Sequence, residues 1–399
     1  MQRSGVTTMN DSRPREIFRR SFRAGSGYEL VLFDRLPMDE QIALAELHAD
    51  PDLYGVLKPA AESGHTVKVV GRDTALLLLT MQSPGTLPSY VFRDDPDVAA
   101  RGITDLVLDG VLEIEHDGRF VAGPAAAELL LGGAAATAVG ALAELSLAAV
   151  RYAGALALAD PGALSNRLYS FHRQPLTPAW SRRLGDREAV LDFLGAAAGS
   201  RERRRLEADW KLSADGEVPG WIAFSARRER RGKGRRSYKL YVSPSIAALP
   251  ETFHGVLAEL GAWGAGNHFK VGTDAAGLLR PDKLVLYFAE LDDLLAVASG
   301  LAERLGGVPV HGVPFTAEIA ARGLLSWGMD PPRSERLLSW QEQGSWRLWV
   351  VQRLAAALIA ARAASDTTMP PWQFALERLR REGIDVDRWT PSAAIWQAA

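Results

Sequence analysis

Three short apolar segments between Tyr238 and Phe288 constrain the fold of this chain most strongly. They are Tyr238–Val242, His268–Gly272 and Leu284–Phe288, and each is rich in β-branched or aromatic residues and bordered by glycine or proline. This composition is typical of β-strands. The spacing of apolar residues from Thr252 to Trp263 indicates a helix between the first strand and the second. The stretch therefore predicts a sheet with at least one helix packed on it.

Basic residues lie inside or beside these strands. Lys239 precedes Leu240, Lys270 follows Phe269, and Arg280 lies in the loop before the third strand. The stem of a lysine is inexpensive to bury, but several cationic heads repel one another unless an anion joins them. The pattern therefore predicts an anion site, although lysines that merely extend their heads to solvent at strand ends would give the same pattern.

The N-terminal half contains a strong hairpin signal between Val111 and Gly123. Two alternating segments flank His116-Asp117-Gly118, and an Asp-Gly pair between alternating segments is typical of a tight β-turn. Two helical patterns precede it, at 74–81 and 97–108. Helices followed by a hairpin resemble a winged helix, with the hairpin as the wing.

Winged-helix units bind DNA in regulators and leader peptides in enzymes that modify ribosomally made peptides. The second predicted helix carries one cation, Arg101, together with Asp97 and Asp105. A helix that must neutralise phosphates would be more basic. The charge pattern favours docking of a peptide or of another part of the chain over DNA, and a purely structural role stays equally open.

The length and composition set the number of domains and exclude several classes. A chain of 399 residues predicts two or three domains, and Asp160-Pro161-Gly162 marks a boundary that divides it into 1–160 and 161–399. The net charge of −2 argues against a protein that binds nucleic acid non-specifically. Cysteine is absent, which excludes disulfides and thiolate chemistry.

The sequence also argues against a membrane protein and a metalloprotein. The N-terminal arginines are followed by no apolar segment, and Leu129–Ala143 is too short and too weakly hydrophobic for a span, so we expect a cytoplasmic protein. The seven histidines are scattered and never paired at ligand spacing. We therefore expect neither a metal nor another cofactor.

The order of these motifs resembles the phosphothreonine-lyase superfamily, and its HopA-like branch most closely. That superfamily includes the lyase domains of class III and IV lanthipeptide synthetases, the stand-alone lyases of class V, and HopA-type effectors. The resemblance covers roughly Trp221 to Ala361. It rests on the motifs Lys239–Pro244, Phe269–Val271, Arg280–Phe288, Gly312–Thr316, Leu324–Gly328 and Ser345–Arg347.

The resemblance implies β-elimination of phosphate from phosphoserine or phosphothreonine without a metal. In the family a lysine removes the α-proton, a histidine protonates the leaving phosphate, and arginines and lysines hold it. By motif position Lys270 matches the base. The phosphate-binding positions match Lys239 and Arg280, with Arg347 and Arg353 as candidates for the remaining clamp.

The family histidine is replaced here by Tyr241. A phenol with a pKa of about 10 can donate a proton, and we expect neighbouring cations to make it more acidic. The same cations, with partial burial, would lower the pKa of Lys270 toward neutrality. Alternatively the phosphate leaves unassisted, or His268 or His311 supplies the proton.

Together these features predict an α+β chain: a winged-helix-like N-terminal domain and a lyase-like α+β domain with a mainly antiparallel sheet. The first hypothesis is a lyase that converts phosphorylated Ser and Thr of a ribosomally made precursor peptide to dehydroalanine and dehydrobutyrine. Its partners would be that peptide and a separate kinase, because the sequence contains no kinase motif. The second hypothesis is a non-catalytic phosphopeptide-binding or scaffold protein of a peptide-modifying complex. A third hypothesis is a winged-helix transcription regulator with an effector-sensing C-terminal domain, which a basic stripe on the winged-helix unit would favour, and the sequence shows none.

Overall fold

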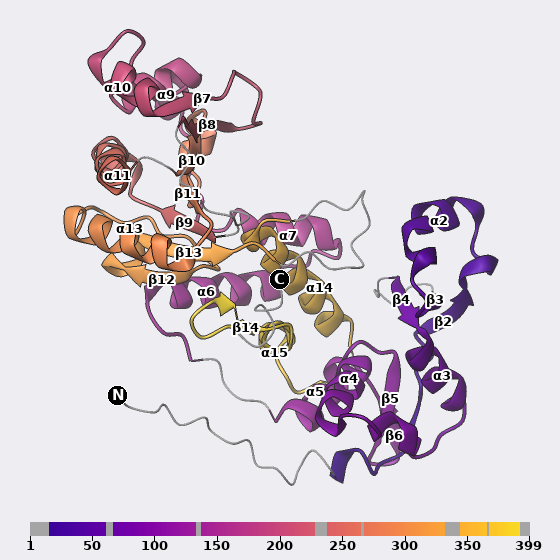
Figure 1. Ribbon diagram of the computed structural model, residues 1–399. Helices are drawn as coiled ribbons and strands as arrows, with labels where there is room; N and C mark the ends of the chain where they lie inside the picture. The colour runs from indigo at the N-terminus through magenta and orange to yellow at the C-terminus, as the bar shows by residue number, and fades with distance from the viewer. Residues whose placement is uncertain are drawn as a thin grey trace. The chain divides into compact units, whose positions relative to one another are not determined.

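The fold is described from a computed structural model in which the chain forms two compact units (Figure 1). The residues described are 16–60, 67–132, 137–227, 238–264, 267–331, 344–364 and 367–391. Unit 1 comprises Met1–Ala135, Ser334–Glu342 and Ala356–Glu377, and unit 2 comprises Ala136–Arg333, Gln343–Ala355 and Arg378–Ala399. In this division residues 137–160 belong to unit 2, whereas the sequence predicts a domain boundary at residue 160.

In unit 1, the predicted hairpin is confirmed. β5 (Leu112–His116) and β6 (Arg119–Val121) pair antiparallel, and β1 (Phe22–Ala24) adds to the other edge of β5. Asp117 and Gly118 have φ of 51° and 77°. Positive φ at both central residues gives a turn whose twist matches that of the strands.

Helices and a second sheet complete unit 1. The predicted helices are present as α3 (Arg72–Thr80) and α4 (Pro96–Leu108), and the core contains apolar side chains from both together with Phe22 and Ile114. The second sheet is antiparallel and has the order β2-β3-β4. The remaining bounds are α2 (Met38–Ala43), α5 (Pro124–Leu131), β2 (Tyr28–Leu32), β3 (Leu53–Pro59) and β4 (Lys68–Gly71).

Unit 2 is organised around a seven-stranded antiparallel sheet with the order β12-β13-β9-β11-β10-β8-β7. The strands are β7 (Trp210–Leu212), β8 (Trp221–Ala226), β9 (Tyr238–Val242), β10 (His268–Gly272), β11 (Leu284–Phe288), β12 (Ala317–Ala320) and β13 (Leu325–Met329). The three strands expected from the sequence are thus confirmed, with β11 between β9 and β10. The expectation of an α+β fold with an antiparallel sheet is also confirmed.

One face of this sheet is apolar and packs against α11 (Leu249–Trp263) and α13 (Leu291–Arg304). Phe224 and Phe269 stack on it with ring centroids 4.3 Å apart. Because side chains alternate along a strand, the intervening residues of β9, β10 and β11 point to the opposite face. That second face carries the candidate functional residues.

The remaining helices lie before, between and after these strands in the chain. Their bounds are α6 (Ala141–Ala155), α7 (Pro161–Tyr169), α8 (Pro178–Arg183), α9 (Arg187–Phe193), α10 (Arg201–Asp209), α12 (Ala275–Leu278), α14 (Trp346–Ala363) and α15 (Pro371–Arg381), followed by the short strands β14 (Ile384–Asp385) and β15 (Thr390–Pro391). None of the described helices combines the length and the hydropathy that a membrane span requires.

Candidate active site

The second face of the sheet brings together residues from three neighbouring strands. On β9 these are Lys239 and Tyr241, on β10 Lys270, and on β11 Val285 and Tyr287. Val285 lies opposite Lys270 on one side and Tyr241 on the other, while Tyr287 lies opposite Lys239. The period-two alternation of three separate strands therefore gathers both predicted lysines and the predicted tyrosine on one surface.

Lys270 lies in an aromatic setting. Its Nζ is 4.1 Å from the ring centroid of Trp221 and 5.6 Å from that of Tyr287. Burial lowers the pKa of the Lys270 ammonium to about 8, and the positive charge of Lys239 acts in the same direction. This agrees with the expectation that burial and neighbouring cations would move this pKa toward neutrality. A lysine with such a pKa is a usable base near neutral pH.

Lys239 is 8% exposed and its charge is balanced by a carboxylate. Its Nζ donates to Oδ1 of Asp330 at 2.5 Å. The same oxygen accepts from the backbone N–H of Trp346 at 3.2 Å. The ammonium lies 5.7 Å from the Tyr287 ring, so it is held on the same surface as Lys270.

Asp282 is the centre of a second group, and it is 4% exposed. Arg280 donates to both its oxygens, from Nε to Oδ1 and from Nη2 to Oδ2, each at 2.9 Å. Arg347 pairs with Oδ2 at 2.9 Å, and the hydroxyl of Tyr169 donates to Oδ2 at 3.1 Å. Although burial alone would raise the pKa of Asp282, the two guanidinium groups hold it well below its usual range.

Arg347 is 1% exposed and is engaged on several sides. Besides the ion pair with Asp282, its Nε donates to the carbonyl oxygen of Pro314 at 3.2 Å and its Nη2 to that of Tyr169 at 2.9 Å. Its guanidinium lies 4.5 Å from the centroid of the Tyr169 ring. These contacts fix the start of α14 to the end of α7.

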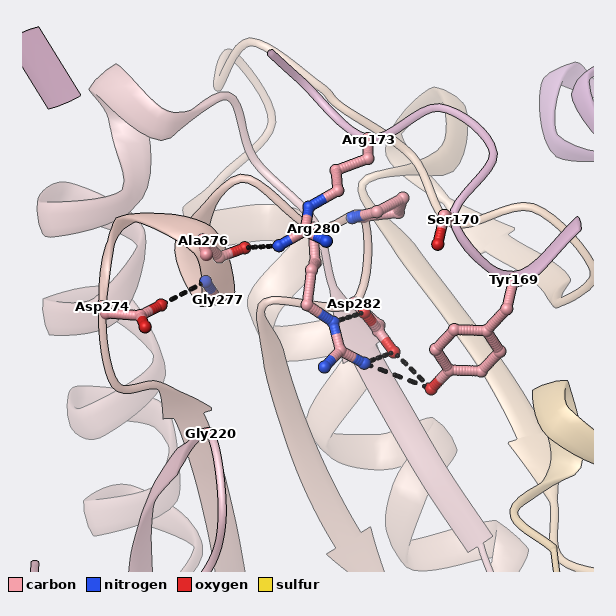
Figure 2. Close-up of a pocket in the computed structure, with 10 residues that line it drawn as sticks. Tyr169, Ser170, Arg173, Gly220, Asp274, Ala276, Gly277, Arg280 and Asp282 are labelled. Atoms are coloured by element: carbon pink, nitrogen blue, oxygen red, sulfur yellow. Dashed lines mark hydrogen bonds and ion pairs between the residues drawn. The ribbon is translucent and has the colours of Figure 1, made fainter. Parts of the chain in front are cut away.

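A pocket of about 250 Å³ opens beside this group (Figure 2). Of the residues predicted to form the site, it includes Arg280. Its walls are formed by Tyr169, Ser170, Arg173, Gly220, Asp274, Ala276, Gly277, Arg280, Pro281 and Asp282. Trp221, next to Gly220, lies 4.8 Å from the Arg280 guanidinium and so connects the pocket to Lys270. The arrangement offers a polar recess, walled by two arginines, next to a weakly basic lysine.

The structure separates Arg353 from these contacts. Its guanidinium pairs with Glu382 and lies 3.7 Å from the Trp349 ring centroid, and its side chain is 37% exposed. Arg347, six residues earlier, points into the Asp282 group instead. Of the two arginines expected to complete the clamp, the structure places one in the candidate site.

Tyr241 is on the expected face, but its environment differs from the expectation. It is 3% exposed and packs with Val285 and Val313. Burial raises the pKa of its phenol well above the ordinary value, and the opposing effect of Arg347 does not cancel this. The expectation that neighbouring cations would make Tyr241 more acidic is therefore wrong, because desolvation disfavours the phenolate more strongly.

Lys283, which follows Asp282 in the chain, makes a buried contact with His311. Lys283 is fully buried, and its Nζ bonds to the carbonyl oxygen of Pro244 at 3.0 Å and to Nδ1 of His311 at 2.7 Å. Burial lowers the pKa of Lys283 to about 7 and that of His311 to about 3. The other ring nitrogen of His311 bonds to the carbonyl oxygen of His172 at 2.6 Å. His311, one of the alternative proton donors, is thus committed to internal contacts.

The sequence did not identify the acidic partners or Tyr169 as site residues. Asp282 stands between Pro281 and Lys283, where it is as readily interpreted as a loop residue, and Tyr169 lies outside the region of family resemblance. The described residues contain no group of three or more histidines and carboxylates that could hold a metal ion. The sequence also contains a basic run at 227–236 that could attract an acidic or phosphorylated chain, and all of it except Arg227 lies outside the described residues.

Comparison with known proteins gives likenesses in structure. No protein-family model and no curated protein sequence matches the chain. An effector protein from Pseudomonas syringae pv. tomato strain DC3000 aligns at 15% identity and a TM-score of 0.40, covering 63% of this chain and 98% of that one. One from P. syringae pv. syringae strain 61 aligns at 14% and 0.37, with coverages of 63% and 98%. The VirA (SpvC) phosphothreonine lyase effector of Chromobacterium violaceum aligns at 14% and 0.26, with 35% and 76%.

Proposed function

We propose that this chain eliminates phosphate from phosphoserine and phosphothreonine residues of a ribosomally made precursor peptide, leaving dehydroalanine and dehydrobutyrine. The observation that carries the proposal is a lysine with a pKa of about 8 beside a polar pocket and an excess of positive charge. Among the described residues, the cations Lys239, Lys270, Arg280 and Arg347 meet the carboxylates of Asp282 and Asp330. With Lys270 neutral, Lys239, Arg280 and Arg347 still carry one positive charge more than the two carboxylates, and this surplus suits a phosphate dianion.

In this proposal Lys270 acts in its neutral form. Its Nζ takes the α-proton of the phosphorylated residue, and the electrons of the Cα–H bond form the Cα=Cβ bond. The Cβ–O bond breaks, and phosphate leaves with that electron pair. The oxidation state of the substrate as a whole does not change, so the step needs a base, a proton donor and charge stabilisation.

The phosphate would be held by Arg280, which lies near the Trp221 ring, and by Lys239, which lies near the Tyr287 ring. Arg280 engages Asp282 through Nε and Nη2, so Nη1 is the nitrogen through which it would reach a substrate oxygen. Lys239 would act as a point charge after partly leaving Asp330. Arg347, whose nitrogens are all engaged within the protein, would act on the phosphate through its charge and not by direct contact. Arg353 is the weakest candidate because of its pairing with Glu382.

We assign the N-terminal region, predicted as 1–160, to docking of the precursor peptide or of the kinase that phosphorylates it. The paired β5 and β6 with α3 and α4 are compatible with a winged-helix-like arrangement. α4 bears Arg101 as its cation beside acidic residues, which supports a peptide rather than nucleic acid as the ligand. A cytoplasmic location fits this assignment.

The second candidate is a non-catalytic phosphopeptide-binding or scaffold protein. The replacement of the family histidine by the deeply buried Tyr241 favours it, because a lyase without a proton donor would bind its substrate without turnover. The two candidates predict different effects of Lys270→Ala. In a lyase the substitution abolishes turnover and keeps binding, whereas in a binding protein there is no turnover to lose.

The test is mass spectrometry of phosphoserine and phosphothreonine peptides, and of the phosphorylated natural precursor, incubated with the protein. We expect loss of the elements of phosphoric acid and a product that adds thiols, abolished by Lys270→Ala. Lys211→Ala, which changes an exposed lysine of β7, is the matched control and keeps the activity. Release of phosphate to give free serine contradicts the elimination, and binding of an unchanged precursor favours the scaffold.

A further inference from the structure

The proposed elimination requires a proton for the leaving phosphate, and the pocket wall contains a phenol in the right setting. Tyr169 ends α7 and lines the pocket (Figure 2). Its hydroxyl donates to Oδ2 of Asp282 at 3.1 Å and accepts from Nη2 of Arg280 at 3.2 Å. The hydroxyl is therefore one hydrogen bond away from the arginine proposed to hold phosphate.

The ring of Tyr169 lies close to two cations. The guanidinium carbons of Arg347 and Arg280 lie 4.5 Å and 5.6 Å from its ring centroid. Arg347 also donates to its backbone oxygen at 2.9 Å. Burial and Asp282 raise the pKa of the Tyr169 phenol and both arginines lower it, so the group rests protonated and its phenolate has nearby positive charge.

Other hydroxyl and imidazole groups fit the role less well, and His268 and Tyr287, which lie on the same face as Lys270, are absent from the pocket wall. Tyr241 is packed among apolar side chains and is absent from the pocket wall. His311 is occupied by Lys283 and by the carbonyl of His172. Ser170 does line the pocket, but an aliphatic alcohol is a far weaker acid than a phenol.

We propose that Tyr169 is a catalytic residue that protonates the bridging oxygen of the departing phosphate. The inference rests on the proposed lyase function and names the acid of that reaction. As the Cβ–O bond breaks, the phenolic proton passes to the oxygen that leaves, and the resulting phenolate stays between Arg280 and Arg347. The proton that Lys270 has taken returns to Tyr169 through solvent, which restores both groups.

The test compares Tyr169→Phe with the wild type on two peptides that differ only in their leaving group, O-phosphoserine and O-thiophosphoserine. Removing a general acid costs about 10²–10⁴-fold in rate. We expect a loss of this size with phosphoserine. With thiophosphoserine the loss is several-fold smaller, because thiophosphate is less basic than phosphate and needs the proton less. Tyr152→Phe, on an exposed residue of α6, is the matched control and keeps the wild-type rate with both peptides.

Two further measurements separate chemistry from structure. A phosphonate analogue of phosphoserine, which cannot eliminate, binds Tyr169→Phe with unchanged affinity if the tyrosine donates a proton rather than shaping the pocket. Tyr169→His, which retains an acidic proton, recovers part of the activity and keeps the proposal testable if the phenylalanine variant does not fold.

The outcomes distinguish a failure of the Tyr169 assignment from a failure of the proposed lyase function. If wild-type protein eliminates phosphate and Tyr169→Phe does so equally fast, Tyr169 is not the acid and the lyase function stands. Equal losses with both leaving groups also overturn the assignment, since they indicate a structural role. If the wild type eliminates nothing from any phosphopeptide, the proposed function falls, and the role of Tyr169 falls with it.

Discussion

The pKa of Lys270 makes the proposed elimination strongly dependent on pH. With a pKa of about 8, roughly one lysine in ten is neutral at pH 7, against about one in three thousand at the ordinary value of 10.5. Since a base must be neutral to take a proton, kcat/KM should rise about tenfold per pH unit below 8 and level off above it. The phosphate has a pKa of about 6, so it does not contribute above pH 7.

Substitution of Lys239 tests the cause of this pKa. In Lys239→Gln the repulsion that lowers the Lys270 pKa is removed and the Asp330 carboxylate loses its partner, and both effects raise that pKa. The curve of kcat/KM against pH should therefore move to higher pH. Each increase of about 1 in the pKa of Lys270 should lower the activity at pH 7 about tenfold. The assay is the initial rate of dehydroamino acid formation between pH 6.5 and 10, at substrate concentrations well below KM.

This design also separates Lys270 from the buried Lys283. The pKa of Lys283, about 7, is set by burial and by Asp282, with no contribution from Lys239. If the rate rises with a midpoint near pH 7, and if this midpoint is the same in Lys239→Gln as in the wild type, then the group that titrates is Lys283. A profile that is flat from pH 6.5 to 9 would refute the role of a neutral lysine altogether.

The remaining predictions concern Asp282 and Arg353. Asp282→Asn leaves the buried guanidinium groups without their carboxylate, so the free energy of unfolding should fall by about 3–5 kcal/mol in urea titrations. Asp274→Asn, which changes a helix-capping carboxylate of the same pocket wall, should lose about 1 kcal/mol or less, and equal losses for both would contradict the central position of Asp282. Arg353→Gln should leave phosphopeptide affinity within about twofold, whereas Arg280→Gln weakens it about tenfold or more, as measured by calorimetry. A large loss for Arg353→Gln would return that arginine to the site.

The strands of unit 2 were predictable because each carries its own local signal. Tyr238–Val242, His268–Gly272 and Leu284–Phe288 were expected and are present at those bounds. The short β7 (Trp210–Leu212) was not expected, since three residues are too few to establish a period. Local pattern also could not give the strand order, which depends on how the segments pair across the chain.

The site was predictable where alternation determines direction and unpredictable where distant segments meet. Lys239 and Tyr241 share a face because they are two residues apart. Tyr169 reaches Arg280 from 111 residues away, and no local pattern reports such a contact. On α14, a spacing of six residues rotates Arg353 by about 120° from Arg347, which explains why only one of them enters the Asp282 group.

Unit 1 is assembled from segments that lie far apart in the sequence, and this affects how the protein folds during synthesis. Leu108 and Ala127 share an apolar cluster with Ala361, Met369 and Phe374. During synthesis the first two emerge from the ribosome more than two hundred residues before their partners. The N-terminal part of unit 1 therefore exposes an apolar surface until almost the whole chain has been translated, because the C-terminal residues that cover it are made last. A nascent chain stalled in the sheet of unit 2 should be a substrate for chaperones, and fragments ending near residue 160 should associate or aggregate.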